Sequence, residues 1–241
     1  MSEKKLHSRG SLLFINKDYV AEFVYGGIDG AITTFAVVAG ASGANLEIKV
    51  VIILGIANLI ADGFSMSVGN FFSTKSERDN YEKHKAIEYW EIENLREREV
   101  EEIREIYAKK GFKGELLEQV VNTITADKHV WVDTMMKEEL EMVKDQKTPI
   151  KTAAVTFIAF VLIGSIPLLS YLFAYFTDLD HSKLFTYSCM LTAAGLAVVG
   201  AFKSVVTNKN VLFSIIETVL LGGVAAVISY MAGSVLENIL R

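Results

Sequence analysis

Residues 50–72 read VVIILGIANLIADGFSMSVGNFF, and residues 73–110 read STKSERDNYEKHKAIEYWEIENLREREVEEIREIYAKK. The first stretch is long and apolar enough to span a bilayer as a helix, which takes about 20 residues. The second stretch changes character at once, because Glu, Lys and Arg dominate it. This change predicts a membrane helix that leads directly into a charged region in water.

The composition of the whole chain shows the same contrast. Of its 241 residues, 51% are hydrophobic and 22% are charged. Residues 73–150 hold 14 Lys and Arg against 19 Asp and Glu, so the formal net charge of −5 belongs entirely to them. A soluble domain rarely averages so apolar, the single cysteine Cys189 excludes a disulfide scaffold, and no stripe of Lys and Arg marks a nucleic-acid binder. A membrane protein with a charged insert is the remaining class.

Apolar segments of similar length occur along the rest of the chain. The sequence predicts five membrane helices, at about Tyr19–Ala41, Val50–Phe72, Thr152–Phe176, Leu184–Val206 and Val211–Ile239. They lack the period-2 alternation of barrel strands, so we expect an all-α membrane protein. The expected parts are an N-terminal segment (1–18), helices one and two (19–72), a helical insert (73–150) and helices three to five (151–241).

Lysine and arginine near the helix ends predict the orientation in the membrane. They gather at the N-terminus, at both ends of the insert and between the fourth and fifth helices, namely Lys4, Lys5, Arg9, Lys17, Lys75, Arg78, Lys147, Lys151, Lys203 and Lys209. The two opposite loops are short and poor in positive charge. We therefore expect the N-terminus and the insert in the cytosol and the C-terminus on the far side. The short loops favour a prokaryotic plasma membrane.

An acidic residue, Asp29, lies midway along the first predicted helix. A charge at the bilayer centre costs about 2.5–3.5 kcal/mol, so such a residue usually faces a cavity or a partner. The structural alternative is a carboxylate hydrogen-bonded to neighbouring helices. Gly26 and Gly30 flank it with the spacing that lets another helix approach closely. Glu217 is compatible with a proton relay or a structural pair, and Lys203 is expected to extend its amine to the interface.

The second predicted helix carries a polar stripe. Asn58, Asp62 and Met66 fall within about 80° of one another on a helix and extend over about 12 Å. A membrane is a poor place for such a stripe unless it lines a path. Carboxylate, amide and thioether together suit a borderline divalent metal better than Ca²⁺ or Mg²⁺. Packing alone would explain Met66, but Asp29 and Asp62 on consecutive helices favour an ion path.

The insert is predicted to form two or three helices, with residues 77–110 and about 115–144 as helical runs and a turn at residues 111–114. If residues 88–102 form one continuous helix, one of its faces carries four acids, Glu88, Glu91, Glu99 and Glu102. A bound divalent cation would relieve their repulsion. From spacing alone, a solvated charged surface is the simpler interpretation, because many other acids lie nearby.

The second insert helix places two methionines beside a glutamate, since Met135 and Met136 precede Glu139 by four and three positions. Methionines at such spacing usually pack in a core or an interface. With Glu139 they could also supply soft and hard ligands to Fe²⁺ or a similar ion. His84 and His129 have no histidine partner at metal spacing, so we expect them to be solvent-facing or structural.

These motifs together resemble the vacuolar iron transporter family, which includes the yeast vacuolar iron/manganese carrier and plant vacuolar iron transporters. The similarity extends from about residue 19 to the end and rests on GGIDGAITTFAVVAG, ADGFSMSVGNFFSTKSE, the Glu-rich insert and IPLL at residues 166–169. The resemblance implies a homodimer of five-span chains with a translocation path at the dimer interface. It further implies export of Fe²⁺, and often Mn²⁺, from the cytosol in exchange for protons.

The resemblance also implies roles for single residues. Asp29 and Met66 match the family's metal positions in the membrane. Its cytosolic metal-binding positions are matched by Glu88, Glu91, Glu99, Glu102, Met135, Met136 and Glu139. Asn58 stands where plant relatives carry Glu, and Asn70 where the family commonly has Glu, so Asp62 is a candidate for part of the missing carboxylate role. The family's usual proline in the first insert helices is absent, which is compatible with a continuous helix.

The resulting hypothesis is a metal/proton antiporter, not an enzyme, without a prosthetic group. Its expected partners are divalent metal ions, protons, membrane lipid and a second copy of the chain, but no nucleic acid. Protonation of an intramembrane carboxylate would weaken metal binding, since ligands must be deprotonated to bind. Two other classes stay open. One is a membrane-anchored iron-binding or ferroxidase protein, although the Glu-x-x-His pairs of di-iron bundles are absent; the other is a passive cation channel.

Overall fold

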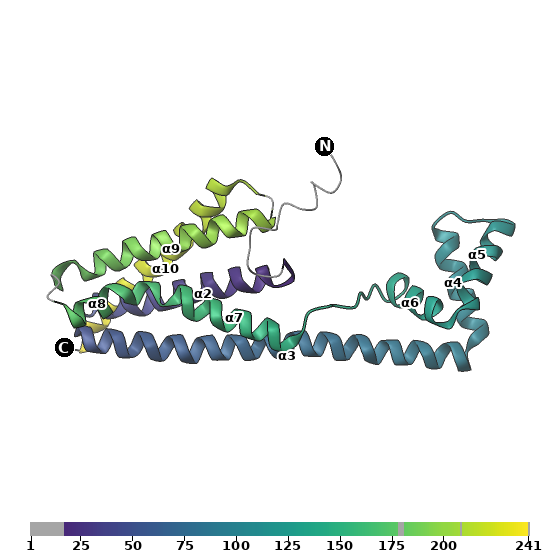
Figure 1. The fold of residues 1–241 in the computed structure, drawn as a ribbon, viewed down its shortest axis with the longest axis horizontal. Helices are drawn as coiled ribbons and strands as arrows, with labels where there is room; N and C mark the ends of the chain where they lie inside the picture. Colours follow the sequence, from purple (N-terminus) through teal and green to yellow (C-terminus); the bar gives the residue numbers. More distant parts are fainter. Residues whose placement is uncertain (1–16, 178–180, 208, 241) are drawn as a thin grey trace. The chain divides into compact units, whose positions relative to one another are not determined.

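The computed structural model describes residues 17–177, 181–207 and 209–240, and all regular elements within these ranges are helical (Figure 1). The α-helices are α2 (Val20–Gly43), α3 (Ile48–Asn94), α4 (Arg96–Lys109), α5 (Gly114–Ala126), α6 (Lys128–Glu138), α7 (Pro149–Gly164), α8 (Leu169–Phe176), α9 (Leu184–Thr207) and α10 (Val211–Leu240). Short 3₁₀ turns are η1 (Lys17–Tyr19), η2 (Ile166–Leu168) and η3 (His181–Lys183). The predicted all-α class is confirmed for these residues. Most of the predicted N-terminal segment, with Lys4, Lys5 and Arg9, lies outside them.

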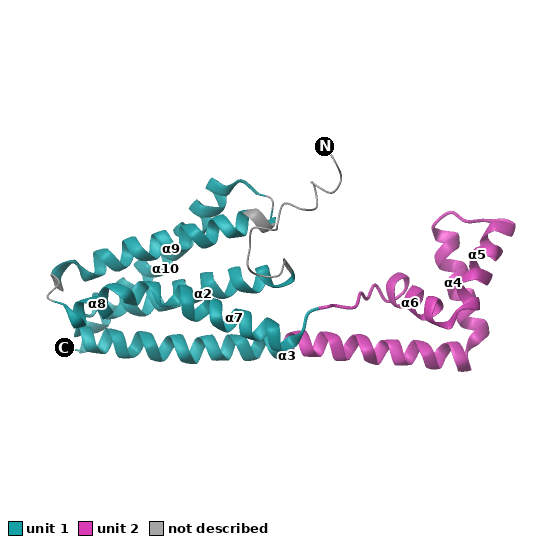
Figure 2. Cartoon of the chain, in the orientation of Figure 1, with its two compact units in different colours: residues 1–72, 147–241 teal, residues 73–146 magenta. Residues whose placement is uncertain are grey.

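The chain divides into two compact units, coloured teal and magenta in Figure 2. Residues 1–72 and 147–241 form one, which we call the membrane unit, and residues 73–146 form the other, the insert unit. Helix α3 contributes its apolar part, up to Phe72, to the membrane unit and its charged part to the insert unit. The two units are described separately below.

Among the described residues, five helical segments are long and apolar enough to cross a membrane, as the sequence predicts. They are α2, α3, α7 with α8, α9 and α10, and the mean hydropathy of their most apolar windows lies between 1.4 and 2.3. The third segment is not the single helix predicted over residues 152–176. Instead, α7 ends at Gly164 and α8 begins at Leu169, because Pro167 lacks the backbone N–H that a continuous helix would need.

Helix α2 packs against α7, α9 and α10 within the membrane unit. Its contact with α7 is close, because a Cβ atom added at Gly26 would lie only 2.7 Å from the backbone oxygen of Thr156. Glycine at this position therefore allows the two backbones to meet, as the small-residue spacing predicts. Val38 of α2 and Phe160 of α7 are fully buried in the same apolar core.

The insert unit has a core of its own. Ile103 of α4 and Trp131 of α6 are fully buried in one apolar cluster, to which α5 adds Val121. Helices α4 and α5 pack together across the predicted turn, where Gly111 and Gly114 adopt φ values of +100° and +59°. Residues with side chains rarely adopt these values, which explains the glycines at both positions.

The first helical run predicted for the insert, residues 77–110, is divided into two helices, so the continuous helix that the sequence left possible does not form. Helix α3 ends at Asn94 and α4 begins at Arg96, with Leu95 between them at φ −125° and ψ 31°. No proline or glycine marks this break. We attribute the break to tertiary packing, which routinely overrides helix propensity. After the bend, Ile103 of α4 is buried, and the Arg96 guanidinium lies 5.0 Å from the centre of the Trp131 ring.

The second predicted run, residues 115–144, is also interrupted. Helix α5 ends at Ala126, and Asp127 caps the start of α6. Its carboxylate accepts hydrogen bonds from the backbone N–H groups of His129 (2.8 Å) and Val130 (3.3 Å). Aspartate is a strong N-cap residue, so the sequence does contain the signal for this boundary. Helix α6 then ends at Glu138, well before the predicted end of the run.

Candidate metal centre

Three glutamates of the insert unit come together at the bend between α3 and α4. Glu88 and Glu91 belong to α3, and Glu99 belongs to α4. Each offers one carboxylate oxygen, and the three oxygens all lie within 4.8 Å of one another. We call these residues the glutamate triad. Carboxylates at such distances repel one another strongly unless a proton or a cation lies among them.

Two members of the triad are buried. Glu88 is 3% exposed and Glu99 is 2% exposed. The Oε2 atom of each is shielded from solvent and has no hydrogen-bond partner among the described residues. A buried charged oxygen without a partner is energetically costly, and native proteins normally satisfy such atoms. A metal ion or a bound proton would satisfy both.

The surroundings of the triad favour the protonated state. Glu88 and Glu99, the two buried members of the triad, both lie outside the apolar part of α3. Burial raises the pKa of Glu88 to about 7, and the nearby carboxylate of Glu139 adds to the effect. Burial also raises the pKa of Glu99 to about 7, with Glu102 as the strongest neighbouring charge. Near neutral pH these groups therefore hold protons part of the time, and a metal ion that binds must displace them.

The two other predicted acidic ligands lie near the triad. The charges of Glu102 and Glu139 both act on Glu88 and Glu99. Partial burial raises the pKa of Glu139, and Glu102 adds to this. Glu102 itself accepts a 3.0 Å ion-pair hydrogen bond from Arg98. The predicted glutamates therefore form one electrostatically coupled group, and the triad is the part compact enough to hold a single ion.

The predicted methionine ligands lie in the core of the insert unit. Met135 and Met136 are 0% and 1% exposed and pack in the cluster that contains Trp131. The backbone N–H of Glu139 donates to the Met135 carbonyl at 3.0 Å, so these residues share the end of α6. The packing interpretation of the methionines is therefore what the structure shows. Their role as metal ligands stays a prediction.

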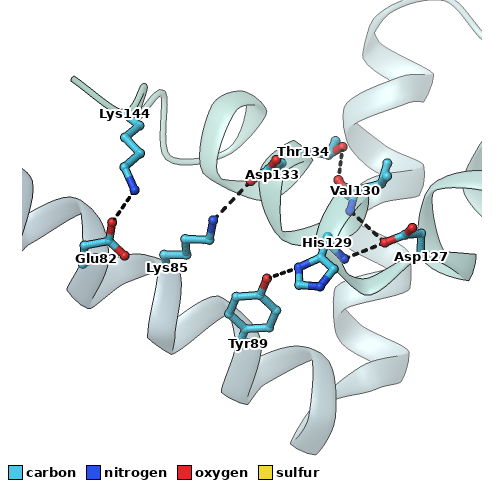
Figure 3. Close-up of polar contacts among 9 residues, drawn as sticks. All are labelled: Glu82, Lys85, Tyr89, Asp127, His129, Val130, Asp133, Thr134 and Lys144. Carbon is cyan, nitrogen blue, oxygen red and sulfur yellow. Dashed lines mark hydrogen bonds and ion pairs between the residues drawn. The ribbon is translucent and has the colours of Figure 1, made fainter. Parts of the chain in front are cut away.

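A row of polar contacts holds α6 and the residues after it on α3 (Figure 3). Its pairs are Lys144 Nζ with Glu82 Oε1 at 2.7 Å, Lys85 Nζ with Asp133 Oδ1 at 3.6 Å, and Tyr89 Oη with His129 Nδ1 at 2.6 Å. The α3 members recur every three or four residues and therefore share one face of the helix. This polar row was not predicted, although that spacing is visible in the sequence. It positions α6 beside the helix that carries Glu88, and His129 is structural.

The insert and the membrane helices occur together in known proteins. A sequence model of the VIT family matches residues 20–234. The chain belongs to the VIT family. It is 35% identical over 228 residues to the vacuolar iron transporter of Toxoplasma gondii (strain ATCC 50861 / VEG), covering 92% of this chain and 76% of that protein. The vacuolar iron transporter of Plasmodium falciparum (isolate 3D7) is 34% identical over 232 residues, with 93% and 84% covered. Vacuolar iron transporter 1 of Arabidopsis thaliana is 32% identical over 227 residues, with 93% and 89% covered.

Two acids of this VIT family member come near each other within the membrane unit. Asp29 of α2 is half-buried and Asp62 of α3 is exposed, and they are close enough to interact electrostatically. Among the residues that the structure describes, neither forms an ion pair with a cationic side chain. The two carboxylates that the sequence analysis assigned to a path therefore influence each other electrostatically, and their role in a path stays a prediction.

The other predicted path residues lie on α3. Asn58 is half-buried, and its Nδ2 has no hydrogen-bond partner within the described part of the chain. Met66 is half-buried and packs against the apolar core shared with α7 and α8. Asn70 donates a 2.8 Å hydrogen bond to Thr156 Oγ1 of α7. The Asn58 Nδ2 group is therefore available as a hydrogen-bond donor, whereas the Asn70 Nδ2 group links α3 to α7.

Two further acids of the membrane helices form ion pairs. Glu217 of α10 accepts a hydrogen bond from Lys203 of α9 at 2.8 Å, which is the structural pair considered from the sequence and gives Lys203 a protein partner. Glu22 of α2 pairs with Lys147 at 2.7 Å, and its side chain is 11% exposed. The second pair was not predicted. An acid in the first turn of a predicted membrane helix is the signal that could have indicated it.

Proposed function

We propose that this protein transports divalent metal ions, Fe²⁺ in the first place and Mn²⁺ as a second cargo, out of the cytosol in exchange for protons. The relatives are named vacuolar iron transporters, and this name supports a transporter rather than an enzyme. The single observation that carries the proposal is the glutamate triad, whose buried oxygens lack partners. The expected prokaryotic plasma membrane stays a prediction.

The triad is proposed to collect the metal on the cytosolic side. The lysine and arginine pattern of the helix ends supports a cytosolic insert. Carboxylate oxygens suit Mn²⁺, and a given site generally binds Fe²⁺ somewhat more tightly than Mn²⁺, so a carboxylate site can accept both ions. Because the triad holds protons near neutral pH, loading it with metal releases protons into the cytosol.

The membrane step is proposed to use Asp29, Asp62 and Met66, with Asn58 as a polar neighbour. Asp62 is exposed on a membrane-spanning helix, and an uncovered charge in the bilayer is costly. The apolar windows of α3 and α10 are each only 22% buried, against 50% for α2, and of these two helices α3 carries the exposed acid without an ion pair among the described residues. We infer that a second copy of the chain covers α3, so that two-fold symmetry supplies each carboxylate twice.

Proton exchange would follow from the same carboxylates. A proton that enters from the acidic side neutralises Asp29 or Asp62 and competes with the metal for their oxygens. The bound ion is then released toward the side with more protons. A pH gradient can therefore drive metal uphill without any further chemistry.

Uptake into proteoliposomes tests this function. We expect a pH gradient, acidic inside, to drive Fe²⁺ or Mn²⁺ uptake by the reconstituted protein, and Asp29→Asn to abolish it. Asp79→Asn, which changes an exposed acid of the insert unit in the same way, is the matched control and should leave uptake unchanged.

Other outcomes identify the alternative classes. Metal flux that does not respond to the pH gradient would indicate a passive channel. Oxidation of Fe²⁺ without uptake would indicate a ferroxidase. Full uptake by Asp29→Asn would contradict the proposed path.

A further inference from the structure

An apolar groove lies in the membrane unit among α2, α9 and α10 and plays no part in the proposed metal path. Its volume is about 410 Å³. Helix α9 lines it from Phe185 to Leu196, and α10 lines it from Val219 to Met231, in both cases with residues three or four positions apart. Residues with this spacing share one face of a helix, so the groove follows the axes of both helices.

The groove has the length of one leaflet of a bilayer. At 1.5 Å per residue, the lining extends about 16 Å along α9 and about 18 Å along α10. The hydrocarbon core of a bilayer is about 30 Å thick, so one leaflet contributes about 15 Å. Phe185 is close to the start of α9, whereas Leu196 is near its middle. Along α9 the groove therefore extends from the start of the helix to its middle, and along α10 it follows the central part of the helix.

The lining offers almost nothing to a polar ligand. The Thr192 hydroxyl donates to the Ser188 carbonyl at 2.7 Å and is thereby satisfied. Phe185 stacks on Phe35 at 6.2 Å and on Tyr230 at 5.4 Å, which places three aromatic rings together at one end. The lining includes residues of α10 that are exposed to their surroundings, which for a membrane helix are lipid chains.

A second, polar hollow adjoins the aromatic end. It has a volume of about 690 Å³ and shares Phe185 with the groove. Its lining includes Ser42 and Asn45 together with one charge of each sign, Glu47 and Lys49. An apolar groove as long as one leaflet, next to a hollow with both charges, matches a molecule with one long tail and a zwitterionic head.

We propose that the groove binds one acyl chain of a membrane phospholipid, with the headgroup at the polar hollow. The chain would fill the space between α9 and α10 and stabilise their packing against α2. Gly223 provides a way to test this, because a Cβ atom added there would meet nothing within 4 Å. A larger side chain at Gly223 therefore occupies the groove without displacing its walls. At Gly222, in contrast, an added Cβ atom would lie only 2.4 Å from Leu196 Cδ1.

The first experiment counts bound lipid. The full chain is purified in detergent, exchanged from phosphatidylcholine mixed micelles into detergent alone, and analysed for retained phospholipid by mass spectrometry. We expect about one phospholipid per chain for the natural protein and none for Gly223→Leu. Val224→Leu adds bulk on the neighbouring, exposed position outside the groove lining and should retain the lipid. Equal retention by all three proteins would overturn the proposal.

The second experiment can be decided with the natural protein alone, because Cys189 lines the groove and is the single cysteine of the chain. Gly223→Leu serves as an additional control. We expect phosphatidylcholine to slow the modification of Cys189 by N-ethylmaleimide about tenfold relative to detergent alone. Gly223→Leu, if its melting temperature shows that it is folded, should react slowly with or without lipid. A rate in the natural protein that does not respond to phosphatidylcholine would exclude an acyl chain from the groove, whatever the variant does.

Discussion

The two units place their acidic residues in different ways. In the insert unit, the glutamate triad gathers three carboxylates within 4.8 Å, and two of them are buried. In the membrane unit, Glu22 and Glu217 are paired with lysines, and Asp29 and Asp62 come from two helices and stay without a cationic partner among the described residues. One unit concentrates negative charge at a point, and the other distributes it.

The difference matches the two tasks of a transporter. A collecting site must hold a dilute ion, which favours several ligands in one place. A path must let the ion leave again, because conduction requires binding that is favourable enough to enter but weak enough to release. Under the proposed function, one chain holds the whole glutamate triad, while the exposed Asp62 is the reason for proposing a second copy at the path. Four predictions test this contrast, from the largest expected effect to the smallest.

The double variant Glu88→Gln/Glu99→Gln should have the largest effect. It removes two charged ligands, and we expect the affinity for Fe²⁺ or Mn²⁺ to fall about a hundredfold in calorimetric titrations of the whole protein. The exposed pair Glu97→Gln/Glu105→Gln is the control for the loss of charge. An unchanged affinity in the first variant would place the collecting site elsewhere and remove the contrast between the units.

The pH dependence of metal binding should be the next largest effect. Because the pKa values of Glu88 and Glu99 are raised to about 7, each group must lose a proton to bind metal, and affinity should fall about tenfold per group between pH 8 and pH 6. The same protons stabilise the metal-free protein. Their contribution to the free energy of unfolding is fully present below pH 4.5, the ordinary pKa of glutamate, and is lost as the pH rises through 7. Thermal unfolding of the metal-free protein at several pH values checks this. Binding that is independent of pH would contradict the assignment.

Asp62→Asn should separate the two units. We expect metal uptake in proteoliposomes to slow several-fold, because Asp29 remains, while the metal affinity of the insert unit stays unchanged. The measurement combines the uptake rate with calorimetry on the same preparation. A loss of affinity comparable to that of the triad variant would show that the membrane carboxylates belong to the collecting site.

Tyr89→Phe should have the smallest effect. It removes the hydrogen bond to His129 in the polar row, and such an exposed bond contributes about 0.5 kcal/mol. We expect a slightly lower melting temperature and a metal affinity reduced less than twofold, with Tyr25→Phe, at an exposed membrane position, as the control. A tenfold loss of affinity would show that the position of α6 controls the triad far more than its contacts indicate.

Much of the membrane unit could be predicted from the sequence. Hydropathy identifies the spans, and the glycine spacing at Gly26 identifies the close approach to α7. The break near Pro167 was visible as well, since proline interrupts helical hydrogen bonding. The ion pair between Glu22 and Lys147 was only partly visible: an acid in the first turn of a membrane helix indicates that it has a partner, but Lys147 is 125 positions away and no local pattern identifies it.

Three of the glutamates that the sequence analysis considered as one group do lie close together, but not through the continuous helix that it considered. A continuous helix over residues 88–102 would place them along one face, whereas the structure brings Glu88 and Glu99 together by bending the chain at Leu95. The bend depends on the burial of Ile103 against residues far along the chain, which local propensity does not encode. The N-cap Asp127, in contrast, is a local signal that the sequence analysis overlooked.

The glycine contacts of α2 have a mechanical consequence. At Gly26 and Gly43 the backbone of α2 lies directly on the backbones of α7 and α10, with no side chain between them to change its rotamer. Such contacts cannot slide without a clash, so they hold α2 in a fixed register against α7 and α10. The glycines of α3 differ, since a Cβ atom added at Gly55 or Gly63 would meet side-chain atoms alone. Under the proposed function, a movement during transport would therefore occur along α3, where side chains can change their rotamers, and not between α2 and its two neighbours.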